Sequence, residues 1–202
     1  MTAGHGVTHS EENPGLTSGE LHGMQLWVAQ PSTTRDRRAD FEHHGELPRA
    51  ELGDATATVR IGSFHNATSP ARRESKLVGV ELQLCGGSTE LPLDPTFEYA
   101  LVVASGAVGV EEQVIRPGSL AYLGLGRELC VMATRGRATA MLIGGVPFDE
   151  KLFMWWNFVA RSQGEVSDAW RAWATGDVRF ARVAAPLHRI EVGPPPWLVT
   201  LC

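Results

Sequence analysis

Short apolar runs recur at regular intervals from Ala50 onward, and turn-forming residues separate them. In the runs 55–61 and 77–84, apolar and polar residues alternate, which indicates strands with one buried face. Pro117-Gly118 separates two further runs and favours a tight turn, because proline presets φ and glycine tolerates a positive φ. The remaining runs that we interpret as strands are 99–103, 105–110, 128–132, 137–143 and 153–159. Many short strands at this spacing predict an all-β fold that closes as a barrel or sandwich.

A short helix is predicted after these strands. Ser162-Gln163-Gly164-Glu165 has the Ser-x-x-Glu spacing of a capping box, in which side chains satisfy free backbone amides at a helix start. The residues that then recur at helical spacing are Val166, Ala169, Trp170, Trp173 and Ala174. We interpret the two tryptophans as core packing, and Gly176 is expected to end the helix. The proline-rich tail around 194–197 is predicted to be extended and to wrap a barrel surface, with a partner-binding proline motif as the alternative.

A histidine and a carboxylate lie two positions apart near the start of the chain, at His9 and Glu11. In an extended segment, residues two positions apart point to the same face. An imidazole nitrogen and a carboxylate oxygen suit iron, manganese, nickel, copper or zinc, so the pair is a candidate half of a metal site. The alternative is a pair of polar residues on a solvated strand face.

The segments 2–11 and 21–28 resemble the pirin family of the cupin superfamily, in which a TAG-x-G-x-x-H-x-E segment is followed by a G-x-Q-L-W strand. The segments 145–150 and 154–161 resemble the part with which many bacterial pirins close their second barrel. Pirins are bicupins, so the resemblance implies cupin-type double-stranded β-helix barrels, with the C-terminal cupin complete and the N-terminal cupin partial. It implies three regions: residues 1–47 as a remnant of the N-terminal cupin domain with a connector, 48–160 as the C-terminal cupin barrel, and 161–202 as a helix with a proline-rich tail.

The resemblance also implies an iron (Fe) site. In pirins the N-terminal barrel binds one iron through three histidines and one glutamate, and His9 and Glu11 match the last histidine and the glutamate of that set. The other two ligands come from an upstream H-x-H motif, which occurs nowhere in this sequence. The chain is therefore expected to be truncated relative to the family and to hold an incomplete iron site. A misassigned start at Met1 and a degenerate paralogue are the alternatives.

The other histidines are expected to be solvated or capping residues rather than ligands. His5 shares a strand face with His9, but it lies about 13 Å away along a straight strand. The adjacent His43 and His44 would face opposite sides of a strand. The same expectation covers His22, His65 and His188. No histidine occurs between Thr89 and Gly145, so no histidine metal site is expected in the second barrel.

Composition excludes several classes of function. The net charge is −5 and basic residues are interspersed with acidic ones, so direct nucleic-acid binding is not expected. Cys85, Cys130 and Cys202 are widely spaced, without the spacing of a disulfide framework or a zinc knuckle, and the first two are expected to be buried. The sequence shows neither an apolar run of membrane-spanning length nor the pattern of a signal peptide, so a cytoplasmic location is expected.

Three functions remain open at this point. The resemblance implies a quercetin 2,3-dioxygenase-type oxygenase acting on a small flavonol-like aromatic substrate, with Glu11 as ligand and candidate base, if the missing ligands are supplied. It equally implies a non-catalytic, redox-sensing partner of transcription factors. A metal-free interaction fragment is the third hypothesis. No catalytic residue and no organic cofactor are assigned. Because strands of a partial barrel keep open edges, association into a homo-oligomer through the N-terminal edge is also predicted.

Overall fold

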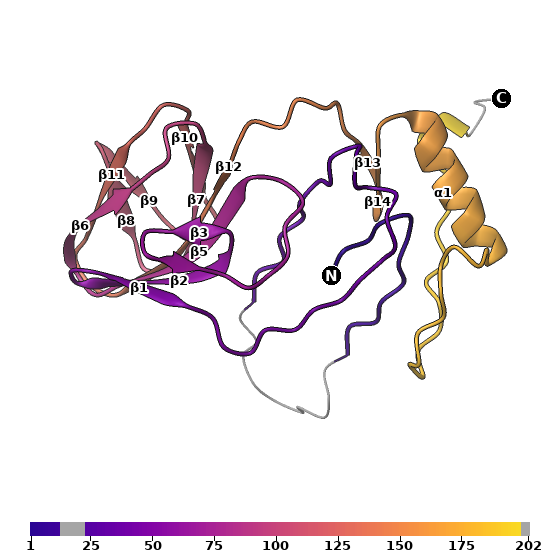
Figure 1. Cartoon of the computed structure of the whole chain (residues 1–202), viewed down its shortest axis with the longest axis horizontal. Coiled ribbons are helices and arrows are strands. Elements are labelled where there is room, and N and C mark those ends of the chain that lie inside the picture. The colour runs from indigo at the N-terminus through magenta and orange to yellow at the C-terminus, as the bar shows by residue number, and fades with distance from the viewer. Residues whose placement is uncertain (13–22, 199–202) are drawn as a thin grey trace. The chain divides into compact units, whose positions relative to one another are not determined.

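The computed structural model describes residues 1–12 and 23–198, and the chain divides into two compact units. The sheet unit comprises Glu42–Phe148, and the helix unit comprises Met1–Phe41 together with Asp149–Cys202 (Figure 1). Each unit has its own apolar core. The first and last parts of the chain thus belong to one unit, although more than a hundred residues separate them in the sequence.

The sheet unit contains two antiparallel sheets and a small two-stranded ribbon. The six-stranded sheet has the order β1 (Arg49–Leu52), β2 (Ala55–Ile61), β5 (Leu77–Leu84), β12 (Ala138–Gly145), β7 (Glu98–Ser105) and β10 (Leu120–Gly124). The four-stranded sheet has the order β6 (Gly87–Pro92), β11 (Leu129–Thr134), β8 (Val108–Val110) and β9 (Gln113–Ile115). The ribbon pairs β3 (Ser63–Phe64) with β4 (Ala67–Thr68). Neighbours such as β5 and β12 are far apart in sequence, so the chain crosses between sheets.

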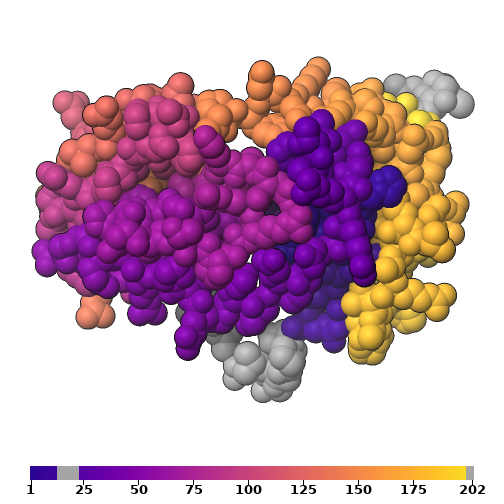
Figure 2. Space-filling model, viewed as in Figure 1, coloured from indigo at the N-terminus to yellow at the C-terminus, as the bar shows by residue number. Residues whose placement is uncertain are grey.

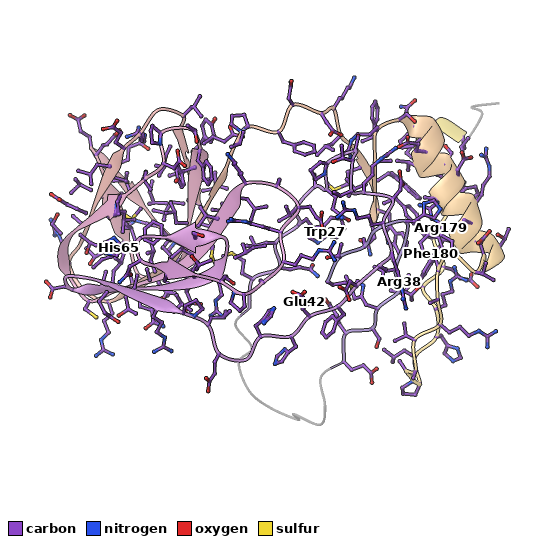
Figure 3. The ribbon with its side chains drawn as sticks, viewed as in Figure 1. Trp27, Arg38, Glu42, His65, Arg179 and Phe180 are labelled. Carbon is purple, nitrogen blue, oxygen red and sulfur yellow. The ribbon has the colours of Figure 1, made fainter. Side chains whose placement is uncertain are left out.

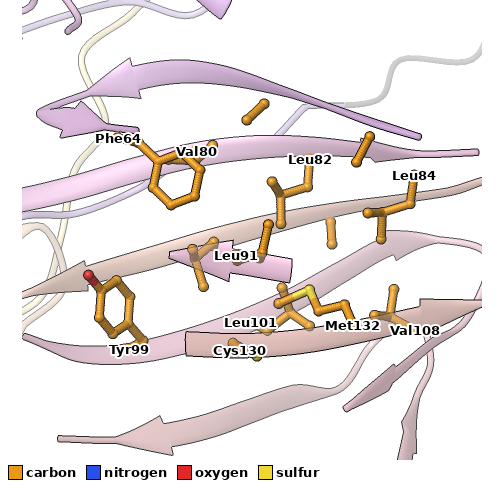
Figure 4. Close-up of a cluster of buried hydrophobic side chains, with 14 of the residues drawn as sticks. Phe64, Val80, Leu82, Leu84, Leu91, Tyr99, Leu101, Val108, Cys130 and Met132 are labelled. Carbon is orange, nitrogen blue, oxygen red and sulfur yellow. The ribbon is translucent and has the colours of Figure 1, made fainter. Parts of the chain in front are cut away.

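One apolar core takes side chains from both sheets of this unit (Figure 4). Leu82 and Leu101 from the six-stranded sheet and Leu91 from the four-stranded sheet have no solvent exposure. Burial of each such side chain stabilises a fold by roughly 1.5–3 kcal/mol. In β7 buried positions alternate with partly exposed ones, as expected of strands that cover a core with one face.

Most of the predicted strands are confirmed. The runs 55–61 and 77–84 coincide with β2 and β5, and Pro117-Gly118 lies in the turn before β10. The run 153–159 is not one strand, because β13 (Phe153–Trp155) and β14 (Phe158–Ala160) form a hairpin in the helix unit. Trp156 adopts a φ of 50° in the connecting turn, which ends the first strand.

The predicted helix is confirmed as α1 (Gln163–Thr175). The hydroxyl of Ser162 accepts the backbone N–H of Glu165 at 3.2 Å, so Ser162 is the N-cap. Gly176 has a φ of 73° and ends the helix in a left-handed conformation that glycine adopts without steric cost. The carboxylate of Glu165 accepts the backbone N–H of Arg161 rather than that of the N-cap residue, so the capping box is modified.

Aromatic side chains build the core of the helix unit, together with Val166 and Ala169 of α1. Trp156 and Phe158 stand 5.2 Å apart between ring centroids, and Trp173 and Phe180 stand 5.4 Å apart. The predicted core role of Trp170 and Trp173 is confirmed, since both pack against the buried residues of this cluster.

The proline-rich tail lies along α1 within the helix unit, and its predicted wrapping of a barrel surface stays a prediction. The indole N–H groups of Trp170 and Trp173 donate to the backbone oxygens of Val192 and Ile190, at 3.0 and 2.9 Å. Trp197, in the short 3-10 helix η1 (Pro196–Leu198), donates to Ser167 Oγ at 2.9 Å. The indole N–H groups would lose their hydrogen bonds to water when the rings pack, and these hydrogen bonds replace them. This explains why the tail packs on α1.

The N-terminal region differs from the prediction of two or three strands between residues 7 and 30. In residues 1–12 and 23–48 the structure has no strand, and Thr2 and Asp40 form an isolated bridge. A strand requires an adjacent strand whose backbone groups accept and donate its hydrogen bonds. An alternating sequence alone does not supply such a partner. The Asn13-Pro14-Gly15 turn that was expected to break these strands lies outside the described residues.

The two described cysteines differ in exposure. Cys130 is buried as predicted, but Cys85 is exposed, because it follows the last residue of β5 where the chain leaves the sheet. Cys202 lies outside the described residues. Among residues 1–12 and 23–198, no helix has both the length and the apolar character needed to cross a membrane.

Candidate metal centre

A tight turn precedes the candidate ligands and requires glycine. Gly4 has a φ of 52°, and a Cβ there would lie 2.0 Å from the backbone oxygen of Arg37. The amide of Gly4 donates to Gln30 Oε1 at 3.1 Å, and Gly6 N–H donates to the oxygen of Ala3 at 2.9 Å. The turn therefore fixes the start of the segment that carries His9 and Glu11. Figure 2 shows these N-terminal residues, in indigo, against the C-terminal residues of the same unit, in yellow.

The structure brings the two predicted ligands together. His9 Nε2 lies 3.8 Å from Glu11 Oε1, and the side chains are 43% and 75% exposed. Bonds from imidazole nitrogen or carboxylate oxygen to a transition metal are about 2.0–2.2 Å long, so one ion between these atoms could contact both. Within residues 1–12 and 23–198, no third histidine, cysteine, aspartate or glutamate joins them in a group that could hold a metal ion. The pair fits half of a coordination sphere.

Gln25 contacts the carboxylate of this pair. Its side-chain amide Nε2 donates to Glu11 Oε1 at 3.1 Å across fourteen positions of sequence. Gln25 is the glutamine of the G-x-Q-L-W segment, for which the sequence alone indicated no role. No periodicity or spacing rule links it to Glu11, and only the shared presence of the two motifs could have signalled the contact.

The remaining histidines have other surroundings. His5 Nδ1 lies 3.6 Å from Asp36 Oδ1. His44 Nε2 lies 3.2 Å from Glu42 Oε2, in the sheet unit. His65 occupies the turn between β3 and β4, where Figure 3 labels it. His43 and His188 are both exposed, and His22 lies outside the described residues.

A carboxylate at the start of the hairpin segment holds the end of the N-terminal segment. Glu150 accepts the backbone N–H of Ser32 at 2.9 Å, its hydroxyl at 2.6 Å, and Nε of Arg161. The hydroxyl of Ser32, then its backbone N–H and then Arg161 stabilise the carboxylate and lower the pKa of Glu150 from 4.5 to about 2.

A second carboxylate ties the same segment to α1. The guanidinium of Arg35 donates to both oxygens of Glu165, at 2.7 and 2.9 Å, and the backbone N–H of Arg161 donates at 2.8 Å. The Arg35 hydrogen bonds are the main cause that lowers the pKa of Glu165 from 4.5 to about 2. Arg179 makes a further contact by donating to the backbone oxygen of His5, and Figure 3 labels it beside Phe180. These contacts join the segment that bears His9 to the C-terminal part of the unit.

The sheet unit carries a separate surface hollow of about 460 Å³ over the outer face of β1, β2 and β5. Its lining is polar and consists of Gly45, Glu46, Leu47, Arg49, Thr58, Arg60, Glu81 and Gln83. The guanidinium of Arg60 pairs with the carboxylate of Glu81, and Arg49 and Glu46 add one further charge of each sign, so the charges of the lining balance. This arrangement favours neither an anion nor a cation.

Comparison with known proteins places the chain in a family. The pirin C-terminal cupin domain matches residues 79–181, just over half of the chain. The chain belongs to the pirin family. A Pseudomonas aeruginosa protein provisionally named quercetin 2,3-dioxygenase is 40% identical over 201 residues, which cover 98% of this chain and 64% of that protein. A pirin-like protein of Caulobacter vibrioides is 35% identical over 89% of this chain and 64% of its own length.

A solved structure supports the same assignment. The crystal structure of a quercetin 2,3-dioxygenase from Acinetobacter baumannii matches with a TM-score of 0.80 at 31% identity, over 84% of this chain and 57% of that chain. The predicted all-β cupin fold is thereby confirmed for this pirin-family chain. The chain spans somewhat less than two thirds of the curated relatives that it matches.

Proposed function

We propose that this pirin-family chain contributes His9 and Glu11 to a transition-metal centre, for which iron is the ion that the resemblance implies. The observation that carries the proposal is the 3.8 Å separation of His9 Nε2 from Glu11 Oε1, which lets one ion contact both donors. Two donors bind an ion weakly, so a tight centre requires further donors from outside the described residues. In this proposal the chain provides a partial site in its helix unit and a cupin fold in its sheet unit.

The oxygenase activity is a second proposal, and the names of two relatives favour it. Both the Pseudomonas aeruginosa protein and the Acinetobacter baumannii enzyme are named quercetin 2,3-dioxygenase, the former provisionally. In a completed centre, a bound iron would supply open coordination positions for a flavonol-like substrate and dioxygen. Glu11 would hold the ion and, as a carboxylate at its side, could accept a proton from a phenolic hydroxyl. Quercetin consumption by the iron-loaded chain measures this activity.

An interaction role is the third proposal, and one exposed segment favours it. Met24, Leu26, Trp27 and Val28 are 39–52% exposed, and the segment that carries them lies in no strand. Figure 3 labels Trp27 on this segment. An extended segment with apolar side chains can pair with another chain, either a second copy or a protein partner such as a transcription factor. Light scattering over a wide concentration range would show larger species if copies associate, and a constant molar mass would exclude that association.

Metal analysis tests the principal proposal. In anaerobic equilibrium dialysis at one fixed concentration of free Fe²⁺, we expect the wild-type chain to bind more iron than His9→Ala, because the imidazole is one of the two donors. His188→Ala is the matched control, since it removes an exposed histidine of the tail. Equal iron contents in wild type and His9→Ala would contradict the proposal.

A further inference from the structure

We propose that Gln25 is a positioning residue for Glu11, so that the G-x-Q-L-W segment serves the metal centre without contacting the ion. This inference rests on the proposed function, because it assigns the glutamine a role in the same centre. It links the two motifs of the N-terminal region through one hydrogen bond, from Gln25 Nε2 to Glu11 Oε1 at 3.1 Å.

The exposure of Glu11 is the reason why such a partner matters. With a side chain that is 75% exposed, Glu11 is not held by packing, and a free glutamate visits many rotamers. The hydrogen bond from Gln25 selects the rotamers in which Oε1 stays on the side of His9. Ion binding then costs less ordering of the carboxylate, and metal ligands that are oriented in this way typically bind 10–100-fold more tightly.

The chemistry of a glutamine suits this position. A carboxylate oxygen carries two lone pairs, so Oε1 can accept Gln25 and still direct electron density toward an ion. The amide is neutral, and it therefore leaves the negative charge of Glu11 for the metal. Arginine or lysine at position 25 would compete with the ion for that charge, while glutamate would repel the carboxylate.

The sheet unit offers a matched control for this contact. Gln83 Nε2 donates to Glu81 Oε1 at 3.3 Å, and Gln83 is exposed like Gln25. Glu81 is already paired with Arg60, and it belongs to the unit that does not contain His9. Gln83→Met thus removes an equivalent surface hydrogen bond away from the proposed centre. Gln25→Met keeps the length of the side chain and removes its donor.

The first measurement is a Co²⁺ titration of the full chain followed by NMR. Co²⁺ binds nitrogen and oxygen ligands at least as tightly as Fe²⁺, and it broadens nearby resonances because it is paramagnetic. We expect broadening of the His9 imidazole signals in the wild type, a tenfold or greater weakening in Gln25→Met, and no change in Gln83→Met. Unchanged tryptophan fluorescence shows that each variant keeps the fold of the helix unit.

The second measurement needs no metal. In ¹H–¹⁵N spectra, the side-chain amide of Gln25 should shift in Glu11→Ala, while that of Gln83 should not. If the Gln25 amide does not move, the positioning role is refuted whatever the ion does.

The outcomes separate the two proposals. Co²⁺ binding that depends on His9 but is equal in wild type and Gln25→Met overturns the role of Gln25 and leaves the metal centre standing. Absence of His9-dependent binding in the wild type overturns the metal centre, and the positioning role falls with it.

Discussion

Among residues 1–12 and 23–198, three non-glycine residues adopt a left-handed backbone conformation, and each lies at the same position of a hairpin loop. His65, Glu111 and Trp156 have φ values of 52°, 55° and 50°. Each is the first residue of a two-residue loop that joins two paired strands. A two-residue hairpin with a positive φ at its first loop position normally has glycine there. A side chain at such a position costs roughly 1–2 kcal/mol, so these loops are strained at a defined residue.

Replacement of one of these residues by glycine should relieve the strain. We expect His65→Gly to raise the free energy of unfolding by about 0.5–1 kcal/mol, after allowing for the larger backbone entropy of glycine in the unfolded chain. The imidazole is exposed, so its removal costs little packing. Thermal unfolding by circular dichroism measures the effect. His65→Ala is the control, because it removes the imidazole and keeps the strain, and equal stability of the two variants would contradict the explanation.

The helix depends on a single capping side chain at its start. Ser162 Oγ accepts the backbone N–H of Glu165, and its loss leaves an unpaired donor in the first turn. We expect Ser162→Ala to lower the free energy of unfolding of the helix unit by about 1 kcal/mol. Urea unfolding followed by tryptophan fluorescence measures it. Ser119→Ala, in the turn before β10, should change the free energy by less than about 0.5 kcal/mol, and an effect equal to that of Ser162→Ala would refute the cap.

Elements whose signals are local could be predicted from the sequence. The alternation in β2 and β5 and the cap residues of α1 are properties of adjacent residues, and they determined the bounds of these elements. The turn at Trp156 could not be predicted, because neither glycine nor proline marks it. The ring packs against Phe158 and Trp173, which come from separate elements, and this packing selects the turn.

At the scale of the whole molecule, contacts between distant segments escaped prediction. The spacing of His9 and Glu11 indicated a pair, and the structure brings the two side chains together. The hydrogen bond of Ser32 to Glu150 and that of Arg35 to Glu165 span 118 and 130 positions, and charged side chains at such separations carry no periodic signal. The sequence therefore predicts the candidate ligands but not the long-range contacts within the unit that contains them.

The distribution of aromatic residues allows the helix unit to be followed separately. All six tryptophans lie in the helix unit, at positions 27, 155, 156, 170, 173 and 197. Both tyrosines, Tyr99 and Tyr122, lie in the sheet unit. Tryptophan fluorescence therefore reports the unfolding of the unit that joins the two ends of the chain.

The two low-pKa carboxylates should make the stability of this unit depend on pH. The pKa of Glu150 and that of Glu165 are about 2 in the folded chain, against 4.5 in the reference state. As the pH falls, the unfolded chain binds protons at these groups before the folded chain does. Their contribution is therefore complete above about pH 4.5 and is lost as the pH falls toward 2. We expect the urea midpoint of tryptophan fluorescence to decrease over this range.

A single substitution separates this effect from general acid unfolding. Glu165→Gln should lower the free energy of unfolding at pH 7 by about 0.5–1 kcal/mol, since the Arg35 pair is partly exposed and solvent screens it. The same variant should lose less stability than the wild type between pH 5 and pH 3, because one of the two titrating groups is gone. Glu128→Gln, an exposed carboxylate of the sheet unit, should keep the wild-type slope. If Glu165→Gln shows the wild-type slope as well, the ion pair with Arg35 does not stabilise the join between the N-terminal segment and α1.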